Sequence, residues 1–457
     1  MSDYQINNPA TGEVEATYPA ATEHEIQQVI EQADSAYQDW RQTPLSERSA
    51  LLHKIADIYL ERQDKLARIV ATEMGKPVAQ AKGEIGLVAD IYRYYADNAE
   101  QLLAPNTIEV DSGSASVEKR PVGVLLGIMP WNYPHYQVAR FVAPNFMAGN
   151  TIILKHAPQC PKTAEMIVDI IKDAGVPAGV YNNIFATNEQ AATIINDTRV
   201  QGVSLTGSER AGQAVAKEAG GALKKVVLEL GGSDAFIVAA DADVEQAVKG
   251  AISGRFGNTG QACNAAKRLI VIESVYDKFV EGFITAVRTM TLADPLDEAT
   301  FIGPMSSKAA AVNLQAQLDS AVQAGATVLV EGGMIKDRPG AWFEPAVLTD
   351  VDESMDVYRE ELFGPVAIVY KARDVDHAIK IANDVPFGLG ASIQTQDAAL
   401  ASKIADKLEV GMVTINAPSG SEANTPFGGV KRSGFGRELG TLGITEFLNY
   451  KLIRDKS

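Results

Sequence analysis

The sequence is poor in cysteine and histidine and lacks a long apolar run. Its 457 residues include two cysteines, Cys160 and Cys263, too few for a disulfide framework. The five histidines show no HxxxH spacing and the cysteines no CxxC spacing, so we expect no metal site, and in particular no catalytic zinc. No apolar stretch approaches the ~18 residues that suggest a membrane span, so we expect no membrane partner.

The chain also lacks an excess of positive charge. Lys plus Arg number 41 against 58 Asp plus Glu, which gives a net charge of −17. Nucleic acids and anionic membranes require a positive face, so neither is expected as the main partner, whereas an anionic small molecule remains possible. The first residues show no basic region and no apolar core of a secretory signal. Together with the scarcity of cysteine, this predicts a cytoplasmic protein.

Short apolar runs alternate with helical patterns along most of the chain. A first series of runs occupies 122–129, 151–154, 183–185, 202–205 and 225–230. A second series occupies 235–238, 268–272, 327–330, 365–370 and 411–416. This alternation is typical of βαβ units, so the sequence predicts two parallel α/β layers in tandem, with a boundary near 230–232. The length fits two large domains or about three smaller ones.

Helical patterns dominate the part of the chain before these layers. Thr22 and Glu25 form a capping box that begins the first predicted helix. A second helical block is predicted over 46–72 and ends before a Gly-Lys-Pro breaker. The polar, alternating segment 99–121 interrupts the helical pattern, and we expect it to form a protruding hairpin.

Cys263 is the first candidate for chemistry. It ends the glycine-rich turn GNTGQAC, which follows a helical pattern over 244–256. A thiol in such a turn can enter a cleft beside backbone N–H donors, a setting that favours a thiolate nucleophile. The alternative is a buried, inert cysteine, which is common for free thiols.

Two further candidates stand where predicted strands end. Glu229 closes the run 225–230, and α/β sheets place ligand-binding and catalytic groups at that edge; the alternative is a strand-end carboxylate that faces water. Asn132 lies in the proline-braced turn PWNYP, where its amide can donate to an oxyanion. Its alternative role is an Asx-turn.

Two features indicate phosphate binding. The segment 202–208 passes from a strand to a helix through Gly207, and free N–H groups at a helix N-terminus bind phosphate. The spacing is not GxGxxG, so this signal has little specificity alone. Lys155, directly after the run 151–154, is placed to reach a ribose or phosphate; otherwise it is a solvated strand-end lysine.

Taken together, these motifs resemble those of the aldehyde dehydrogenase superfamily, in the same order and over nearly the whole chain. The motifs are PWNYP at 130–134, TGS at 206–208, LELGGS at 228–233, FGNTGQAC at 256–263, EELFGP at 360–365 and PFGGVKRSGFGRE at 426–438. The likeness is greatest to the succinate-semialdehyde dehydrogenase branch. It implies an α/β fold with a Rossmann-like NAD(P)-binding domain, a second α/β catalytic domain and a β-arm for oligomerisation.

The resemblance also implies boundaries and roles. The cofactor domain would comprise 1–98 and 122–230, the catalytic domain 231–435, and the arm 99–121 and 436–457, which implies a homodimer or homotetramer. Cys263 matches the nucleophile, Glu229 the general base, and Asn132, with the backbone N–H of Cys263, the oxyanion hole. The predicted cofactor-binding residues are Trp131, Lys155, His156, Ala157, Pro158, Gly207, Ser208, Leu230, Glu361 and Phe363.

The branch implies that the aldehyde is succinate semialdehyde and the product succinate. Arg140, eight residues after Asn132, is predicted to return over the same mouth and hold the distal carboxylate; its alternative role is a structural salt bridge. Relatives that have a second carboxylate-binding arginine carry it where Gly257 stands here, and Arg255 is two residues further back. Hydroxyls of the loop 416–425, Ser421 among them, are predicted to supply donors instead.

Cofactor preference depends on one position. NAD-selective relatives often carry a glutamate three residues after the lysine that matches Lys155, and here that residue is Pro158. The loss of this carboxylate removes repulsion toward a 2′-phosphate, so we expect NADP⁺ to be preferred and NAD⁺ also to be used. The alternatives are another aldehyde specificity (medium-chain or glyceraldehyde-type), a cysteine esterase or hydrolase, and a non-catalytic relative.

Overall fold

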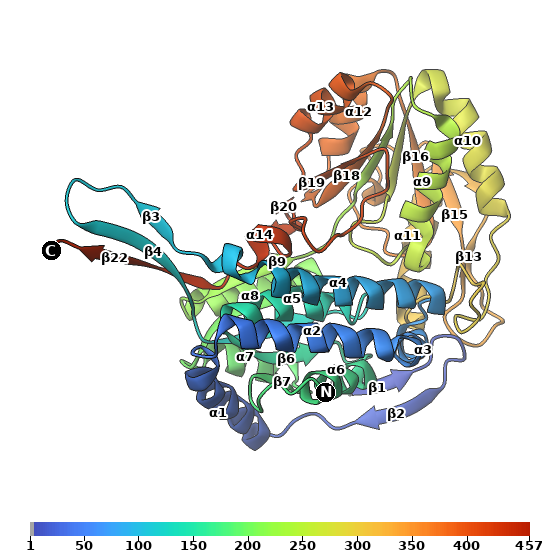
Figure 1. The fold of residues 1–457 in the computed structure, drawn as a ribbon. Helices are drawn as coiled ribbons and strands as arrows, with labels where there is room; N and C mark the ends of the chain where they lie inside the picture. The colour runs from blue at the N-terminus through green and yellow to red at the C-terminus, as the bar shows by residue number, and fades with distance from the viewer. Residues whose placement is uncertain (1–3) are drawn as a thin grey trace.

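The protein folds into two lobes and a projecting arm (Figure 1). The computed structural model describes residues 4–457. A six-stranded sheet forms the core of one lobe, a seven-stranded sheet forms the core of the other, and a three-stranded sheet forms the arm. None of the helices described in residues 4–457 has the length and apolar character that a membrane crossing requires. The predicted α/β fold with two largely parallel sheets in tandem is confirmed.

The first sheet has the strand order β21-β9-β8-β5-β6-β7. Its strands are β5 (Val124–Met129), β6 (Thr151–His156), β7 (Tyr181–Asn183), β8 (Val200–Thr206), β9 (Lys225–Glu229) and β21 (Gly434–Phe435). All neighbours pair in parallel except β21, which is antiparallel to β9. The chain runs from β5 outward to β7 and returns to β8 on the other side of β5. The strand order therefore reverses between β5 and β8, where open α/β sheets bind their ligands.

Helices cover both faces of this sheet because the side chains of its strands alternate between two apolar clusters. Leu125 and Met129 of β5 join one cluster, whereas Val124 and Leu126 join the other. The first cluster contains side chains of α2 (Leu45–Glu61), α4 (Val78–Leu103), α5 (Tyr136–Ala148) and α6 (Pro161–Asp173). The second contains side chains of α1 (Glu23–Trp40), α7 (Asn188–Asn196) and α8 (Glu209–Gly221).

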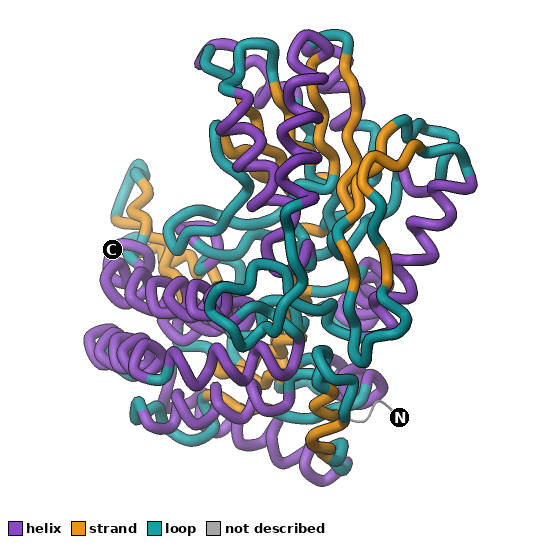
Figure 2. Tube along the Cα trace, turned by 90° about the vertical axis from the view of Figure 1, so that its right-hand side faces the viewer, coloured by secondary structure: helices purple, strands orange, loops and turns teal. Residues whose placement is uncertain are grey.

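The second sheet follows the same rule and has the order β12-β15-β16-β11-β10-β18-β19. Its strands are β10 (Ala235–Val238), β11 (Arg268–Ile272), β12 (Thr327–Val330), β15 (Ala346–Thr349), β16 (Val366–Ala372), β18 (Gly390–Gln394) and β19 (Met412–Ile415). Helices lie beside the strands of this lobe (Figure 2). They are α9 (Val244–Phe256), α10 (Glu273–Arg288), α11 (Lys308–Gln323), α12 (Val375–Asn383) and α13 (Ala398–Lys407). Phe236 and Val238 of β10 face α9 and α10, whereas Ala235 and Ile237 face the cluster of α11, α12 and α13.

The arm joins two distant parts of the chain in one antiparallel sheet. It consists of β3 (Asn106–Ile108), β4 (Ser114–Pro121) and β22 (Leu448–Asp455), with β4 in the centre. The arm extends away from both lobes (Figure 1). The remaining elements are short: β1 (Tyr4–Asn7), β2 (Val14–Tyr18), α3 (Gln63–Met74), β13 (Gly333–Met334), β14 (Phe343–Glu344), β17 (Phe387–Gly388), β20 (Val430–Lys431), α14 (Gly440–Gly443) and the 3-10 helices η1 (Gly257–Gly260) and η2 (Asp356–Tyr358).

Several details differ from the expectations. The helical block predicted over 46–72 is two helices, α2 and α3, which meet at Arg62. Helix α4 continues to Leu103, so only the later part of 99–121 forms the predicted hairpin. Strand β12 pairs antiparallel with β15 rather than in parallel. Strand β21 lies within the range assigned to the catalytic domain but pairs in the first sheet, because its backbone completes the open edge of β9. The capping box of Thr22 and Glu25 is confirmed.

Candidate active site

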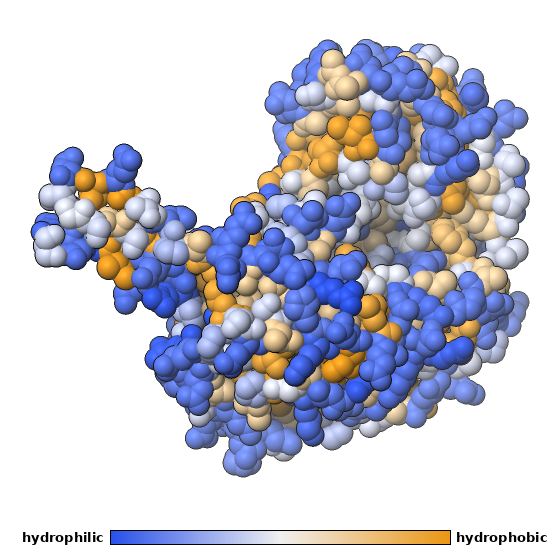
Figure 3. Space-filling model, in the orientation of Figure 1, coloured by the Kyte–Doolittle hydropathy of each residue, from blue (hydrophilic) through white to orange (hydrophobic). Residues whose placement is uncertain are grey.

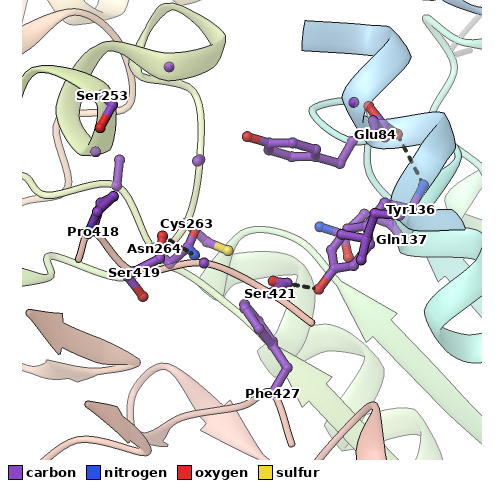
Figure 4. A pocket seen from close by; sticks show the side chains of 18 residues that line it. Glu84, Tyr136, Gln137, Ser253, Cys263, Asn264, Pro418, Ser419, Ser421 and Phe427 are labelled. Carbon is purple, nitrogen blue, oxygen red and sulfur yellow. Dashed lines mark hydrogen bonds between the residues drawn. The ribbon is translucent and has the colours of Figure 1, made fainter. Parts of the chain in front are cut away.

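Two cavities meet at Cys263, in the hollow between the lobes (Figure 3). The first cavity has a volume of about 290 Å³ and the second about 270 Å³. Cys263 and Gln137 line both of them. The first cavity lies between α4 and α5 on one side and the loops around Cys263 and Ser419 on the other (Figure 4). A reagent in either cavity would therefore reach the same thiol.

The backbone before Cys263 is held in an uncommon conformation. Asn258 and Thr259 have φ angles of 52° and 55°, the left-handed region that β-branched residues rarely adopt. The Asn258 amide donates to the carbonyl oxygens of Asn132 and Gln261 at 2.9 and 3.2 Å. The Thr259 hydroxyl is hydrogen-bonded to the backbone of Gly303. These contacts fix the turn, and strain of this kind concentrates at functional sites.

The Cys263 thiol lies in an environment that disfavours the free thiolate. Burial raises its pKa to about 12, while the positive charges of Arg140 and Lys267 act in the opposite direction. The carboxylates of Glu361 and Asp234 raise it further. The expected thiolate-favouring setting is thus only partly present. Removal of the thiol proton requires a base or an additional electrostatic contribution.

Asn132 lies beside the nucleophile candidate, as expected. It follows β5 and lines the second cavity together with Cys263. Its buried amide donates to the carbonyl oxygen of Gln261 at 3.1 Å, two residues before Cys263. An amide group carries two N–H donors, so one remains for a ligand. The structure therefore brings Asn132 and Cys263 together in the wall of one cavity.

Glu229 lies behind the cavities and lines neither of them. Within residues 4–457 its two carboxylate oxygens are buried and have no hydrogen-bond partner. Burial raises its pKa well above the ordinary value, against the pull of Arg140. Gly428 makes room for it, because a Cβ at that position would lie 2.7 Å from Oε1 of Glu229. A raised pKa makes the ionised form of this carboxyl group a stronger proton acceptor, which suits a general base.

The second cavity lies at the reversal point between β5 and β8 and collects most of the predicted cofactor residues. Those that line it are Trp131, Gly207, Ser208, Leu230, Glu361 and Phe363. Trp131 and Phe363 meet edge to face at 5.7 Å between ring centroids. Ser208 caps α8 by accepting from the N–H of Ala211, which leaves the other first-turn N–H groups of α8 directed toward solvent or ligand. Anions bind at such helix N-termini.

The segment 155–158 does not line this cavity. Lys155 is buried and forms no ion pair within residues 4–457, and burial lowers its pKa to about 8. The His156 ring is buried, with Nε2 2.9 Å from the carbonyl oxygen of Pro134 and Nδ1 accepting from the N–H of Ala157, so both ring nitrogens already have partners within the protein. The Pro158 carbonyl accepts from the N–H of Gln5. An ammonium near the end of β6 without an ion-pair partner in residues 4–457 fits an anionic group of a dinucleotide.

Arg140 is not where the sequence placed it. Its side chain is fully buried, lines neither cavity and forms an ion pair with Glu438. It also stacks over Phe427, 4.5 Å from the ring centroid, and donates to the hydroxyl of Thr206 at 3.1 Å. The helix does return it toward the site, but Glu438 holds the guanidinium below the cavity wall. The structure shows the alternative role, a structural salt bridge, and the predicted direct clamp on a substrate stays a prediction that the lining of neither cavity supports.

The wall of the first cavity contains several polar side chains but no cation from the described residues. Ser421 lines it, as expected, and accepts from the phenol of Tyr136 at 2.9 Å. Glu84 also lines it, with its charge compensated by an ion pair to the buried Lys76. Gly257 leaves open space, because a Cβ there would meet nothing within 4 Å. Arg255 is fully buried and donates to the carbonyl oxygens of loop 362–366, so it does not replace the missing arginine.

The comparisons with known proteins agree with this geometry. A family model described as "Aldehyde dehydrogenase family" matches residues 2–453. The chain belongs to the aldehyde dehydrogenase family. The succinate-semialdehyde dehydrogenase [NADP(+)] of Deinococcus radiodurans is 51% identical to it over 98% of this chain and 94% of the relative. The succinate semialdehyde dehydrogenase [NAD(P)+] Sad of Escherichia coli is 42% identical over 98% and 96%.

Solved structures of the family superpose closely on this chain. The structure described as giving insights into cofactor and substrate selection by Gox0499 has a TM-score of 0.98 and 46% identity and covers 100% of both chains. The succinic semialdehyde dehydrogenase of Streptococcus pyogenes, solved with NADP⁺, has a TM-score of 0.97 and 42% identity. That comparison covers 99% of this chain and 100% of the other. The aldehyde dehydrogenase fold is thus shared over the full length.

Three residues of this aldehyde dehydrogenase site escaped the sequence analysis. Tyr136 and Gln137 lie on the first turn of α5, directly after the PWNYP motif, and Gln137 has a buried Oε1 without a partner in residues 4–457. Lys267 follows the nucleophile by four residues and contacts its backbone. The signal that could have identified these three residues is their position directly after the PWNYP motif and the turn that ends at Cys263. Among the described residues, no group of three or more acidic, histidine or cysteine side chains is arranged to hold a metal ion.

Proposed function

We propose that this aldehyde dehydrogenase oxidises succinate semialdehyde to succinate, prefers NADP⁺ and also accepts NAD⁺. The observation that carries the proposal is the position of Cys263 between two cavities of suitable size, one of them at the strand-order reversal. Full-length relatives named as succinate-semialdehyde dehydrogenases, 42–51% identical, support the choice of substrate. The absence of a carboxylate at Pro158 supports the preference for NADP⁺.

The first chemical step belongs to Cys263. The Cys263 thiol releases its proton to water, and the thiolate attacks the carbon of an aldehyde in the first cavity; the product is a thiohemiacetal whose former carbonyl oxygen carries the negative charge. The free N–H of the Asn132 amide and the backbone N–H of Cys263 donate to that oxygen in a site that contains little water. The contact of Asn132 with Gln261 fixes the amide before the substrate arrives.

A nicotinamide dinucleotide bound in the second cavity supplies a hydride acceptor. Trp131, Glu361 and Phe363 would hold its nicotinamide half, and the N-terminus of α8 and Lys155 would bind its phosphates. The loss of hydride leaves a thioester on Cys263. Glu229 then takes a proton from the water that hydrolyses the thioester, and the raised pKa of this buried carboxyl group makes its carboxylate a stronger proton acceptor. The products are the free thiol and a carboxylic acid.

The distal carboxylate of the substrate is assigned to neutral donors. Ser421 and Ser419 lie on the loop opposite α5, and Gln137 faces the same cavity (Figure 4). Hydroxyl and amide groups bind a carboxylate more weakly than a bidentate arginine does, but they still discriminate against an uncharged end. The open space beside Gly257, where a Cβ would meet no atom within 4 Å, leaves room for the distal carboxylate.

A homo-oligomer is proposed from two sheet edges. Within residues 4–457, β22 pairs with β4 alone, and it exposes Tyr450, Leu452 and Ile453. Strand β19 is the edge of the second sheet and exposes Ile415. Unpaired edges with apolar side chains favour pairing with another chain. Sedimentation velocity on the full chain distinguishes a dimer or tetramer from a monomer, which would contradict this part of the proposal.

The deciding experiment compares succinate semialdehyde with butanal, its analogue without the carboxylate, in the presence of NADP⁺ and of NAD⁺. We expect NADPH formation with a clear advantage in kcat/KM for succinate semialdehyde and none with the Cys263→Ser variant. Equal rates for both aldehydes would retain the dehydrogenase and overturn the substrate. Ester hydrolysis without any reduction of either dinucleotide would instead support the cysteine hydrolase alternative.

A further inference from the structure

Lys267 is buried at the back of the nucleophile loop. Its ammonium nitrogen lies 2.8 Å from the carbonyl oxygen of Ala262 and 2.7 Å from that of Cys263, and it donates to both. The same nitrogen lies 3.2 Å from Oε1 of Glu361. The side chain is only 1% exposed. A buried ammonium with three acceptors has its donors fully used, so it is held in one place.

Glu361 connects this ammonium to the second cavity. Its Oε1 also accepts from the backbone N–H of Gly232 at 3.1 Å, and its side chain lines the second cavity beside Cys263. One ion pair therefore joins the peptide of the nucleophile, the loop after β9 and the wall of the second cavity. A change in the charge of either partner would therefore alter the electrostatic environment at all three places.

The charges that face the thiol come from several elements. Arg140 and Lys267 are the cations, and Glu361 and Asp234 are the opposing carboxylates. Arg140 forms an ion pair with Glu438, which compensates part of its charge. The phenols of Tyr133 and Tyr136 also lie within range of the thiol. Lys267 is the cation bonded to the peptide of Cys263 itself.

We propose that Lys267 is a positioning residue of the reaction, whose ammonium fixes the peptide of Cys263 and stabilises its thiolate, and that Glu361 opposes this effect on the thiolate. The inference rests on the proposed function, in which Cys263 is the nucleophile. It assigns opposite electrostatic effects to the two partners of one ion pair. A purely structural ion pair has no such asymmetry, because removal of either partner loosens the same contact.

The test is alkylation of Cys263 by iodoacetamide as a function of pH, in the full chain without cofactor or aldehyde. Mass analysis of the Cys263 peptide separates it from Cys160, which is fully buried. The Lys267→Met variant keeps the length of the side chain and removes the charge. We expect its thiol to titrate about one pH unit higher, a roughly tenfold slower alkylation at neutral pH.

The direction in which each variant of the ion pair changes the alkylation rate decides between the two roles. Glu361→Gln is expected to accelerate alkylation severalfold, and Lys267→Arg is expected to restore most of the rate. Lys407→Met, which removes the exposed partner of Asp376, serves as the control and should leave the pH profile unchanged. An equal slowing in Lys267→Met and Glu361→Gln would overturn the inference, and so would no shift in either. If Lys267→Met does not fold, the Glu361→Gln acceleration alone decides.

This measurement also separates the inference from the proposed function. Alkylation requires neither an aldehyde nor a dinucleotide, so the predicted shifts can appear in a protein that fails to oxidise succinate semialdehyde. In turnover, Lys267→Met should lower kcat more than it raises KM for the aldehyde, because the effect lies on the nucleophile and not on substrate binding. A change confined to KM would contradict the positioning role.

Discussion

The phenol oxygen of Tyr136 lies 2.9 Å from the hydroxyl oxygen of Ser421, and the same phenol accepts from the Arg140 guanidinium at 3.3 Å. The positive charge of Arg140 is thus one hydrogen-bonded phenol away from the first cavity. It polarises the Ser421 hydroxyl without entering the site. Arg140 therefore acts on the first cavity through the phenol of Tyr136, whereas the sequence predicted a direct contact with the substrate.

The first prediction concerns Ser421. Ser421→Ala should lower kcat/KM for succinate semialdehyde by roughly tenfold, because a hydrogen bond to a charged carboxylate is lost. The rate with butanal should stay nearly constant, since that aldehyde has no carboxylate to bind. Steady-state rates with both substrates check this. A parallel loss for both would show that Ser421 shapes the cavity and does not recognise the carboxylate.

The second prediction concerns the stability of the buried pair of Arg140 and Glu438. Arg140→Met leaves Glu438 buried without its cation, which should lower the free energy of unfolding by ~3–5 kcal/mol. Calorimetry should show a clear drop in Tm. Arg62→Met, which removes an exposed partner of Asp173, should cost about 1 kcal/mol or less. An Arg140→Met protein of unchanged Tm that no longer distinguishes succinate semialdehyde from butanal would restore the direct clamp.

Part of the fold and of the candidate site could be predicted from the sequence. Local patterns predicted the strands 235–238 and 268–272 and the helix 244–256 with the observed bounds, because apolar runs and caps are short-range signals. The residues Trp131, Gly207 and Glu361 could be assigned to one cofactor site through the family resemblance, and all three line the second cavity. The position of Arg140 could not be predicted, because its partner is 298 positions away.

Two other features, strand β18 and the His156 ring, also depend on contacts between distant parts of the chain. Strand β18 is short and contains Gly390, Ala391 and Ser392, so its sequence carries little β signal; pairing with β10 and β19 makes it a strand. The His156 ring is held by the Pro134 carbonyl, a contact that only the folded sheet creates. Tertiary partners decided both outcomes, and no local pattern contains them.

The third prediction concerns cofactor preference. Pro158→Glu places a carboxylate near the site predicted for the 2′-phosphate and should lower kcat/KM for NADP⁺ by roughly tenfold through repulsion. NAD⁺ should be affected little. Pro158→Gln is the matched control, because the glutamine side chain has the length of glutamate without its charge. Equal losses for both cofactors in Pro158→Glu would exclude an electrostatic role for this position.

The fourth prediction is a pH dependence. Burial lowers the pKa of Lys155 to about 8, so its ammonium is present below that pH and is lost as pH rises through it. KM for NADP⁺ should therefore rise by roughly tenfold between pH 7.5 and 9.5, while KM for NAD⁺ rises less, because the lost charge acts mainly on the additional phosphate. Lys155→Met should raise KM for NADP⁺ and remove this difference. An identical pH profile for both cofactors would contradict the assignment.

The fifth prediction uses the space at Gly257. Gly257→Arg introduces a cation where a Cβ meets no neighbour, and the backbone φ of −53° allows any side chain. The ratio of kcat/KM for succinate semialdehyde over butanal should rise by roughly tenfold, because a charge-assisted bond to the carboxylate is added. Gly257→Met fills the same space without charge and should not raise the ratio. A similar result for both variants would indicate cavity volume as the cause.

The pairing of β21 with β9 has a consequence for biosynthesis. Chains leave the ribosome from the N-terminus and their domains generally fold as units in that order. Here the edge of β9, the partner of Arg140 and the Phe427 side chain all come from residues 427–438, near the end of the chain. The nucleophile is therefore translated long before its surroundings are complete. A nascent chain carries Cys263 without a finished pocket, so activity can begin only after residues 427–438 have been synthesised.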